Sequence, residues 1–487
     1  MSTSIVVKNS DQTTTRLAIE DDKLVIQAVN DKSDTKTIDL EFIYGIDHHG
    51  DKVDIHTAVI QDPVTEKIEA NANQTLTNIR PKDAKWILRT LHYQTDTAAT
   101  ATEASSSLSE FVTQLKAQVA PHHLTFPETE VIVVLNPSSG ARQAESQWNT
   151  IVKPMLITAG FAESKLTKIT TESDGKTRAL VEALGQRILA STEAGKSAPI
   201  IISMGGDGTL HEVVNGLSDA AATTGAKGHF RLAVIPAGSG NAFALGLNID
   251  SIEQATLKII KGLEEKPFYY MDVKFGHSEK HDRQWHDHVE YDETKKPVRL
   301  LVVLSWGFHA QIVSKSRYLR YFMGNKRFSL VAMFLLTFLQ QYEGEVVLKK
   351  ATTYNKDDGG FDGPPHTMFL EKDDKFTYFV ISKQHSLEKG FKIAPFASCL
   401  SDDMDVVILR EADKDKLTEA SMAAFQGGEH VKIPGVEYFK AKELLLRVED
   451  KAEICLDGEI HNVPAKGVVH MKVEKSSTDK LAFTIFA

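Results

Sequence analysis

The sequence predicts an α/β domain built on a parallel sheet, followed by an antiparallel β-sandwich and preceded by a smaller β-rich module. Between residues 129 and 267, apolar strand-like runs alternate with amphipathic helix-like segments, which is typical of a parallel sheet covered by helices on both faces. Over residues 268–487 strand-like runs follow one another, which favours an antiparallel sandwich. A chain of 487 residues is long enough for two or three domains.

The composition is that of a soluble globular protein, with 42% hydrophobic and 25% charged residues. A formal net charge of -10 disfavours nucleic acid as a partner. The two cysteines, Cys399 and Cys455, argue against a disulfide framework and favour a reducing compartment. No secretory signal is visible, and the most apolar helix-length stretch, residues 328–339, is too short to span a bilayer. We therefore expect a cytoplasmic protein that associates with membranes only peripherally.

Residues 1–95 are expected to form a β-rich module that ends in a helix. Short runs such as LVIQAV are separated by polar turns, a pattern typical of antiparallel strands. Residues 81–94 begin with proline and carry apolar side chains at helical spacing, so a helix is predicted there. Strands followed by one helix resemble a pleckstrin-homology architecture, with a plain β-rich cap as the alternative. Residues 96–128 are expected to be a small-polar linker and a short helix.

Three loops in the α/β segment each follow an apolar strand-like run: NPSSG at 136–140, GGDGT at 205–209 and PAGSGN at 236–241. The carboxyl ends of parallel strands lie at one edge of a sheet, so these loops should converge there. Glycine-rich backbone beside a helix N-terminus forms a concave surface that binds phosphate groups. The three loops together therefore predict a site for nucleotide phosphates.

Asp207 is unusual in such a setting, because a carboxylate repels phosphate. It is suited to accept a proton from a hydroxyl or to bind a metal, and the alternative is a helix N-cap. The segments DGKT (174–177) and AGKS (194–197) do not complete the phosphate-loop spacing, and Phe243 breaks the dinucleotide fingerprint. The histidines and aspartates of residues 277–288 lack regular spacing, so a solvated loop is favoured there over a metal site.

The chain resembles the lipid kinases of the diacylglycerol-kinase catalytic-domain superfamily, and within it the sphingoid long-chain base kinases. The segments that carry the resemblance are NPSSG, TTESDGKTRALV, GGDGTLHEVVNGL, IPAGSGNAFALGL, SWGFHA, APFASCLSDDMDVVIL and ICLDGE, spread over roughly residues 129–487. The resemblance implies that the α/β domain binds ATP and Mg²⁺ and that the sandwich binds a lipid at a membrane surface.

The same resemblance assigns roles to individual residues and makes Asp207 the catalytic base. The residues that it places around the nucleotide are Asn136, Pro137, Ser138, Thr171, Glu172, Ser173, Asp174, Gly175, Gly205, Gly206, Gly208, Glu212, Ser239, Asn241, Arg320, Arg327, Asp457, Gly458 and Glu459. The residues that it places around the lipid are Trp306, Phe308, Gln311 and Phe328. The ligands of Mg²⁺ and the oligomeric state are left unassigned.

Position 311 departs from the pattern of the sphingoid base kinases, which carry an aspartate there. Because Gln311 is uncharged, the sequence predicts a weaker preference for an amine-bearing lipid. The expected activity is ATP-dependent phosphorylation of the primary hydroxyl of a sphingoid base, with a diacylglycerol or ceramide kinase as the alternative. A soluble kinase of the NAD-kinase type and a non-catalytic lipid-binding protein are the rival classes. The apolar segment 328–339 and the intact Asp207 argue against them.

Overall fold

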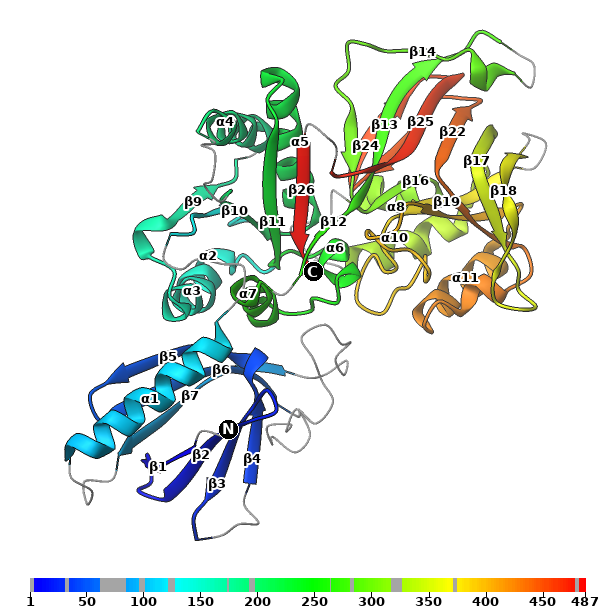
Figure 1. Cartoon of the computed structure of the whole chain (residues 1–487). Helices are drawn as coiled ribbons and strands as arrows, with labels where there is room; N and C mark the ends of the chain where they lie inside the picture. Colours follow the sequence, from blue (N-terminus) through cyan, green and yellow to red (C-terminus); the bar gives the residue numbers. More distant parts are fainter. Residues whose placement is uncertain are drawn as a thin grey trace.

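The computed structural model shows three modules joined along the chain (Figure 1). It describes residues 4–30, 35–61, 85–95, 101–120, 128–172, 175–191, 198–262, 264–280, 284–316, 326–370, 375–477 and 481–487.

The first module is an antiparallel sheet with the strand order β4-β3-β2-β1-β7-β6-β5. Its strands are β1 (Ser4–Asn9), β2 (Thr14–Glu20), β3 (Lys23–Ala28), β4 (Thr35–Asp39), β5 (Ile43–His49), β6 (Lys52–Gln61) and β7 (Lys85–Thr95). Helix α1 (Ala101–Val119) lies along this sheet and buries Leu108, Phe111 and Leu115 in its core (Figure 1). Strands followed by one helix are therefore present, but in different residues from those predicted.

The predicted helix over residues 81–94 is wrong in the part that the structure describes. Lys85–Thr95 form strand β7, which pairs with β6 from Lys85 opposite Gln61 to Gln94 opposite Lys52. This long ladder stabilises the strand, so pairing with a distant segment overrides the helical spacing of the apolar residues. The helix lies instead within residues 96–128, predicted as a small-polar linker and a short helix, where α1 has 19 residues and takes in much of the predicted linker.

The α/β domain has a six-stranded sheet with the order β12-β26-β11-β10-β8-β9. The parallel strands are β8 (Val131–Leu135), β9 (Leu166–Thr170), β10 (Ile200–Gly205), β11 (Gly228–Pro236) and β26 (Leu481–Phe486), and β12 (Glu265–Pro267) is antiparallel to β26. The helices are α2 (Ala144–Gln147), α3 (Lys153–Ala159), α4 (Lys176–Ala190), α5 (Asp207–Thr224), α6 (Ala242–Gly246) and α7 (Ile252–Lys261). Strands β8 and β10 are buried throughout, as expected for a sheet covered on both faces.

The position of strand β26 differs from the one predicted for residues 481–486. Its sequence was predicted to belong to the sandwich, but it pairs in parallel with β11, with Phe230 opposite Phe483. The sandwich is therefore connected to the α/β sheet twice, once through β12 and once through β26. A strand's own sequence does not show which sheet it joins, because both sheets bury similar apolar residues.

The remaining strands form a thirteen-stranded antiparallel sheet that bends around its own apolar core. They are β13 (Tyr269–His277), β14 (Glu290–Tyr291), β15 (Val298–Leu300), β16 (Val303–Gly307), β17 (Gly344–Tyr354), β18 (Phe361–Leu370), β19 (Phe376–Ser382), β20 (Met404–Arg410), β21 (Val436–Ala441), β22 (Glu443–Val448), β23 (Ala452–Leu456), β24 (Glu459–Val463) and β25 (Gly467–Lys475). Its helices are α8 (Phe308–Ser316), α10 (Lys326–Thr337) and α11 (Lys414–Phe425). Across the described residues, no helix combines the length and apolarity needed to cross a membrane.

The first module packs against α3 and α7 of the α/β domain (Figure 1). Lys261, the last residue of α7, donates from Nζ to the carbonyl oxygens of Leu40 (2.9 Å) and Val119 (3.1 Å). Burial lowers the pKa of Lys261 to about 7. Phe42 and Trp86 share one apolar core with the helices of the α/β domain. The module is thus an integral part of the molecule.

Candidate active site

The three predicted loops meet at the carboxyl edge of the parallel sheet. Strand β8 leads into Asn136, whose backbone N–H donates to the carbonyl oxygen of Met204 (3.0 Å). After β11, the N–H of Ala237 donates to the carbonyl oxygen of Gly205 (3.0 Å). Strands β8, β10 and β11 are neighbours in the sheet, so the loops that follow them lie side by side. The convergence predicted from the sequence is confirmed.

Three of the six glycines in these loops, Gly140, Gly206 and Gly238, are needed where one backbone passes close to another. A β-carbon on Gly206 would lie 2.7 Å from the carbonyl oxygen of Gly240, and one on Gly238 would lie 2.3 Å from the Cα of Gly206. Gly208 differs, because a β-carbon there would meet nothing within 4 Å. The loops are therefore packed against each other, and the backbone at Gly208, in the first turn of α5, is open.

Asp207 is the first residue of α5, and its carboxylate caps a different helix. Its Oδ2 accepts from the N–H of Ala242 (2.8 Å) and its Oδ1 from the N–H of Phe243 (2.9 Å), at the start of α6. Burial raises the pKa of Asp207 to about 6, against the opposite effect of these two hydrogen bonds. The carboxylate is thus held in one orientation, and a raised pKa suits a general base. Asp207 therefore does cap a helix, as in the alternative interpretation, but the helix is α6. Each carboxylate oxygen keeps a lone pair that can accept a further proton.

The turn of Asp457 and Gly458 ties the sandwich to α5. Both residues have a positive φ, of 48° and 93°, and they join β23 to β24. The Asp457 carboxylate accepts from three successive backbone N–H groups, of residues 301–303, at 2.8–3.0 Å. Nδ1 of His211 lies 2.9 Å from Asp457 Oδ2, and the Asp457 side chain is only 1% exposed. This geometry favours an anchoring role for Asp457 and leaves Glu459 as the exposed acid of the turn.

Glu212 and Glu459 are the acids that could hold a metal ion beside a nucleotide. Burial raises the pKa of Glu212, and the nearby negative charge of Glu459 raises it further. The described part of the chain contains no group of three or more histidine, cysteine, aspartate or glutamate side chains that could hold a metal. In phosphoryl-transfer sites Mg²⁺ is usually held by one or two carboxylates together with substrate phosphates. The pair therefore fits Mg²⁺ only in company with bound phosphates.

The two asparagines assigned to the nucleotide shape the loops themselves. Asn136 donates from Nδ2 to Thr209 Oγ1 (3.2 Å) and accepts from the N–H of Ser138 (3.0 Å). Asn241 accepts from the N–H of Gly238 (3.1 Å) and donates to its carbonyl oxygen (2.8 Å). Both side chains therefore fix the turns that follow β8 and β11.

Some of the other residues assigned to the nucleotide are described by the structure, and the rest lie outside its described residues. Glu172, Ser138 and Ser239 are exposed, Thr171 and Pro137 are half-buried, and Gly175 precedes α4 with a φ of 73°. Ser173, Asp174 and Arg320 lie outside the described residues, and the side chain of Arg327, in α10, is not described.

Comparison with known proteins assigns this architecture to a family. Residues 130–270 match the family described as "Diacylglycerol kinase catalytic domain", and residues 303–473 match the "YegS C-terminal NAD kinase beta sandwich-like domain". The chain therefore carries a diacylglycerol kinase catalytic domain followed by a YegS-type C-terminal domain, and its curated relatives are lipid kinases at low identity. Lipid phosphorylation is the class of reaction that the members of this family indicate for the site.

Curated relatives are similar over most of their own length. They include "Putative lipid kinase YtlR" of Bacillus subtilis, 27% identical over 67% of this chain and 92% of that protein. Sphingosine kinase 1 of Homo sapiens is 26% identical over 70% of this chain and 88% of its own. A diacylglycerol kinase of Bacillus subtilis is 25% identical over 72% of this chain and 98% of its own.

Solved structures support the fold. A crystal structure titled as that of a "putative diacylglycerol kinase" from Bacillus anthracis matches with a TM-score of 0.50 at 15% sequence identity. The match covers 75% of this kinase and 97% of the other chain, so the likeness spans both the α/β domain and the sandwich.

The residues assigned to the lipid occupy different environments in the kinase. Trp306 is 1% exposed, and its ring packs against that of Phe376 with centroids 5.3 Å apart, in the core of the sandwich. Phe308 is also buried, whereas Gln311 on α8 and Phe328 on α10 are half-buried. Side chains alternate along β16, so Trp306 points away from the face that α8 covers. The structure thus places Trp306 in the core, where it supports the sandwich.

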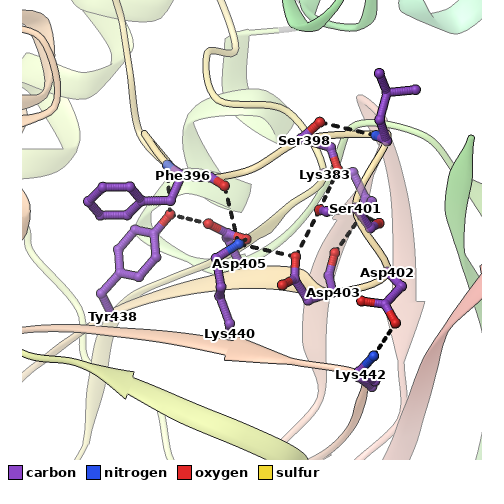
Figure 2. Close-up of polar contacts among 11 residues, drawn as sticks. Lys383, Phe396, Ser398, Ser401, Asp402, Asp403, Asp405, Tyr438, Lys440 and Lys442 are labelled. Atoms are coloured by element: carbon purple, nitrogen blue, oxygen red, sulfur yellow. Dashed lines mark hydrogen bonds and ion pairs between the residues drawn. The ribbon is translucent and has the colours of Figure 1, made fainter. Parts of the chain in front are cut away.

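A cluster of charged side chains holds the segment between β19 and β20 (Figure 2). Lys383 donates from Nζ to the carbonyl oxygens of Ser401 (2.7 Å) and Asp403, and burial lowers its pKa to about 8. Asp405 accepts from Tyr438 and from Lys440 (2.9 Å), and burial raises the pKa of Asp405 to about 6.

This cluster reaches the active site of the kinase through the residue after Lys383. Gln384 donates from Nε2 to the carbonyl oxygen of Leu301 (2.8 Å), and the N–H of Leu301 donates to Asp457. A β-carbon on Gly246, at the end of α6, would lie 1.8 Å from Gln384 Oε1. The segment is therefore packed between α6 and the residues before β16 whose N–H groups bind Asp457.

Two candidate functional residues of the kinase, His211 and Glu453, were not identified from the sequence. His211 lies one helical turn after Asp207, and that spacing was a usable signal for a shared face. Glu453 on β23 accepts a hydrogen bond from Gln311 Nε2 (3.1 Å), and no local pattern indicated this pairing across 142 residues.

Proposed function

We propose that this kinase transfers the γ-phosphoryl group of ATP to the primary hydroxyl of a sphingoid base. In this reaction the lipid oxygen forms a bond to the γ-phosphorus as the bond to the ADP oxygen breaks. The hydroxyl proton passes to the carboxylate of Asp207. The observation that carries the proposal is the placement of Asp207, fixed by two N–H donors at the open first turn of α5 with its pKa raised to about 6.

The loops supply the phosphate contacts in this proposal. Backbone N–H groups at the start of α5 bind phosphate oxygens, aided by the partial positive charge of the helix N-terminus. Mg²⁺ would be held by Glu212 and Glu459 and would neutralise charge on the phosphates. Arg320 and Arg327 are proposed to contact phosphate oxygens, a role that suits the guanidinium group.

The lipid is proposed to be taken from a membrane surface by a protein that associates with it peripherally in the cytoplasm. Helix α10 and the residue that follows it expose four large apolar residues, each 48–69% exposed: Leu330, Met333, Phe334 and Phe338. Single exposed apolar residues are ordinary, but three on one short helix and a fourth directly after it suit insertion into a lipid surface. The same helix contacts α8, which carries Gln311.

A diacylglycerol or ceramide kinase is the second candidate, because Gln311 carries no charge and a diacylglycerol kinase is among the relatives. Radiolabelled ATP offered with sphingosine, diacylglycerol, ceramide or NAD tests all the candidates. We expect label in the phosphorylated sphingosine. Label in diacylglycerol or ceramide alone would support the second candidate. Label in NAD alone, or in none of the four, would contradict the proposed lipid kinase activity.

A further inference from the structure

The hydrogen bond between Gln311 and Glu453 places a carboxylate beside position 311, where the chain itself has an uncharged amide. Gln311 Nε2 donates to Glu453 Oε2 over 3.1 Å, and both residues are half-buried. A carboxylate can only accept hydrogen bonds, so the amide must turn its nitrogen towards Glu453. The carbonyl oxygen of Gln311 is then left to accept from another group.

Glu453 differs from other acids of the sandwich in its partners. Glu443 pairs with Lys349 (2.9 Å) and Glu437 with Arg410 (2.7 Å). Within the described ranges, Glu453 forms no ion pair with a lysine, arginine or histidine, and its hydrogen bond comes from a neutral amide. Among the described residues, this half-buried carboxylate therefore has no ion-paired counter-charge to offset its desolvation.

The face of β23 that carries Glu453 is the face covered by α8. Ile454 and Leu456 point into the core of the sandwich, so Glu453 and Cys455 point to the opposite side. Ser305 is paired with Cys455 in the ladder and therefore shares that side. Helix α8 contacts both β16 and β23. Glu453 thus faces the region between α8 and the sheet.

Two further polar residues of this region, His309 and Tyr378, are neutral, and the nearest lysine on α8, Lys315, is exposed. His309 accepts or donates one hydrogen bond at Nδ1, to Ser305 Oγ (2.8 Å), and burial lowers the pKa of His309 to about 4. The ring of His309 packs edge-on against Tyr378, whose buried hydroxyl has no partner among the described residues. One carboxylate among neutral hydroxyl and amide groups suits a ligand that carries one ammonium group beside hydroxyls.

We propose that Glu453 supplies the counter-charge for the ammonium group of the lipid substrate, with Gln311 holding the carboxylate in place. This assignment rests on the proposed function, because it concerns the headgroup of the lipid that the kinase phosphorylates. It makes Glu453 a specificity-determining residue that favours an amine-bearing lipid over a neutral one.

The test compares sphingosine with diacylglycerol, in mixed micelles, for the wild type and for Glu453→Gln. The measured quantity is the ratio of kcat/KM for the amine to kcat/KM for the neutral lipid. We expect the variant to lower this ratio about tenfold, because an ion pair is replaced by a neutral hydrogen bond. The control is Glu449→Gln, because Glu449 pairs with Lys466 on the sandwich and should leave the ratio unchanged.

Each outcome decides the assignment. An unchanged ratio, or an equal loss for both lipids, would overturn the role of Glu453. If Glu453→Gln does not fold, Glu453→Asp keeps the charge on a shorter side chain and should lower the ratio by a smaller factor. An unchanged ratio in that variant would overturn the role as well. A wild type that phosphorylates only neutral lipids would also overturn it, whereas a wild type that phosphorylates no lipid would overturn the proposed function instead.

Discussion

His211 and Asp457 join the two halves of the active site through a 2.9 Å hydrogen bond between Nδ1 and Oδ2. His211 lies on α5, one turn after Asp207, and Asp457 lies in the turn between β23 and β24. Because Asp457 also accepts from three backbone N–H groups before and within β16, its carboxylate fixes the sandwich to the helix that begins at Asp207. The position of the proposed base therefore depends on a contact between domains.

The first prediction is that His211→Ala destabilises the kinase by about 1.5–3 kcal/mol, the range for a hydrogen bond to a charged group. We expect kcat to fall while the Kd for ATP changes little, because the His211 side chain contacts Asp457 and holds the geometry between the two domains. His211→Asn, which can still donate from a shorter side chain, should recover part of both losses. Denaturant unfolding and steady-state kinetics measure the two effects, and an Asn variant no better than Ala would argue against positioning.

Asp207→Asn should lower the rate of lipid phosphorylation by about 10²–10⁴-fold, because the amide cannot accept the proton of the lipid hydroxyl. In the wild type, the fraction of ionised Asp207 falls as the pH drops through its pKa of about 6. The value of kcat/KM should therefore decline below about pH 6, and the variant should lack this limb. Near-normal turnover in the variant would assign Asp207 to structure alone.

Alanine substitutions at Gly238 and Gly208 distinguish the packing of the loops from the binding of a ligand. Gly238→Ala should cost about 1–3 kcal/mol of stability, because its β-carbon would lie 2.3 Å from the Cα of Gly206. Gly208→Ala has open space and should fold normally, yet weaken ATP binding where the phosphate approaches the backbone. Thermal unfolding and ATP titration distinguish the two, and unchanged ATP affinity in Gly208→Ala would place the phosphates elsewhere.

The exposed face of α10 should carry the membrane contact. Replacing Met333 and Phe334 by serine removes two large apolar side chains that are 69% and 66% exposed. Burying such a side chain contributes about 1.5–3 kcal/mol, so binding to lipid vesicles should fall at least tenfold. Met422→Ser on α11, where the side chain is 59% exposed, is the control and should bind as the wild type does. Equal loss in both would mean that α10 has no special role.

The phosphate site could be predicted further from the sequence than the lipid site. Loops that follow parallel strands meet at one edge by topology, so the grouping of Asn136, Asp207 and Asn241 needed only the alternation of strands and helices. The partners of Asp457 and Glu453 lie far away along the chain, on elements whose packing no local pattern specifies. The helix predicted over residues 81–94 is wrong for the same reason, because the long ladder between β7 and β6 outweighs the helical spacing of the apolar residues.

The last prediction exchanges the acid and the amide at positions 311 and 453. The sequence alone suggests that an acid at 311 would raise the preference for an amine. With Glu453 only 3.1 Å away, two carboxylates there cannot both ionise readily, because like charges at that distance raise a pKa strongly. Gln311→Glu alone should therefore leave the ratio of amine to neutral lipid almost unchanged.

The double variant, Gln311→Glu with Glu453→Gln, restores one carboxylate and one amide in the reverse order. Its ratio of kcat/KM values should return to within about threefold of the wild type, although Glu453→Gln alone lowers it about tenfold. Measured in the same micelles, the four proteins form a complete double-mutant cycle. A tenfold rise in Gln311→Glu with Glu453 intact would show that residue 453 does not already provide the counter-charge, and the ammonium site would then have to be sought on α8 alone.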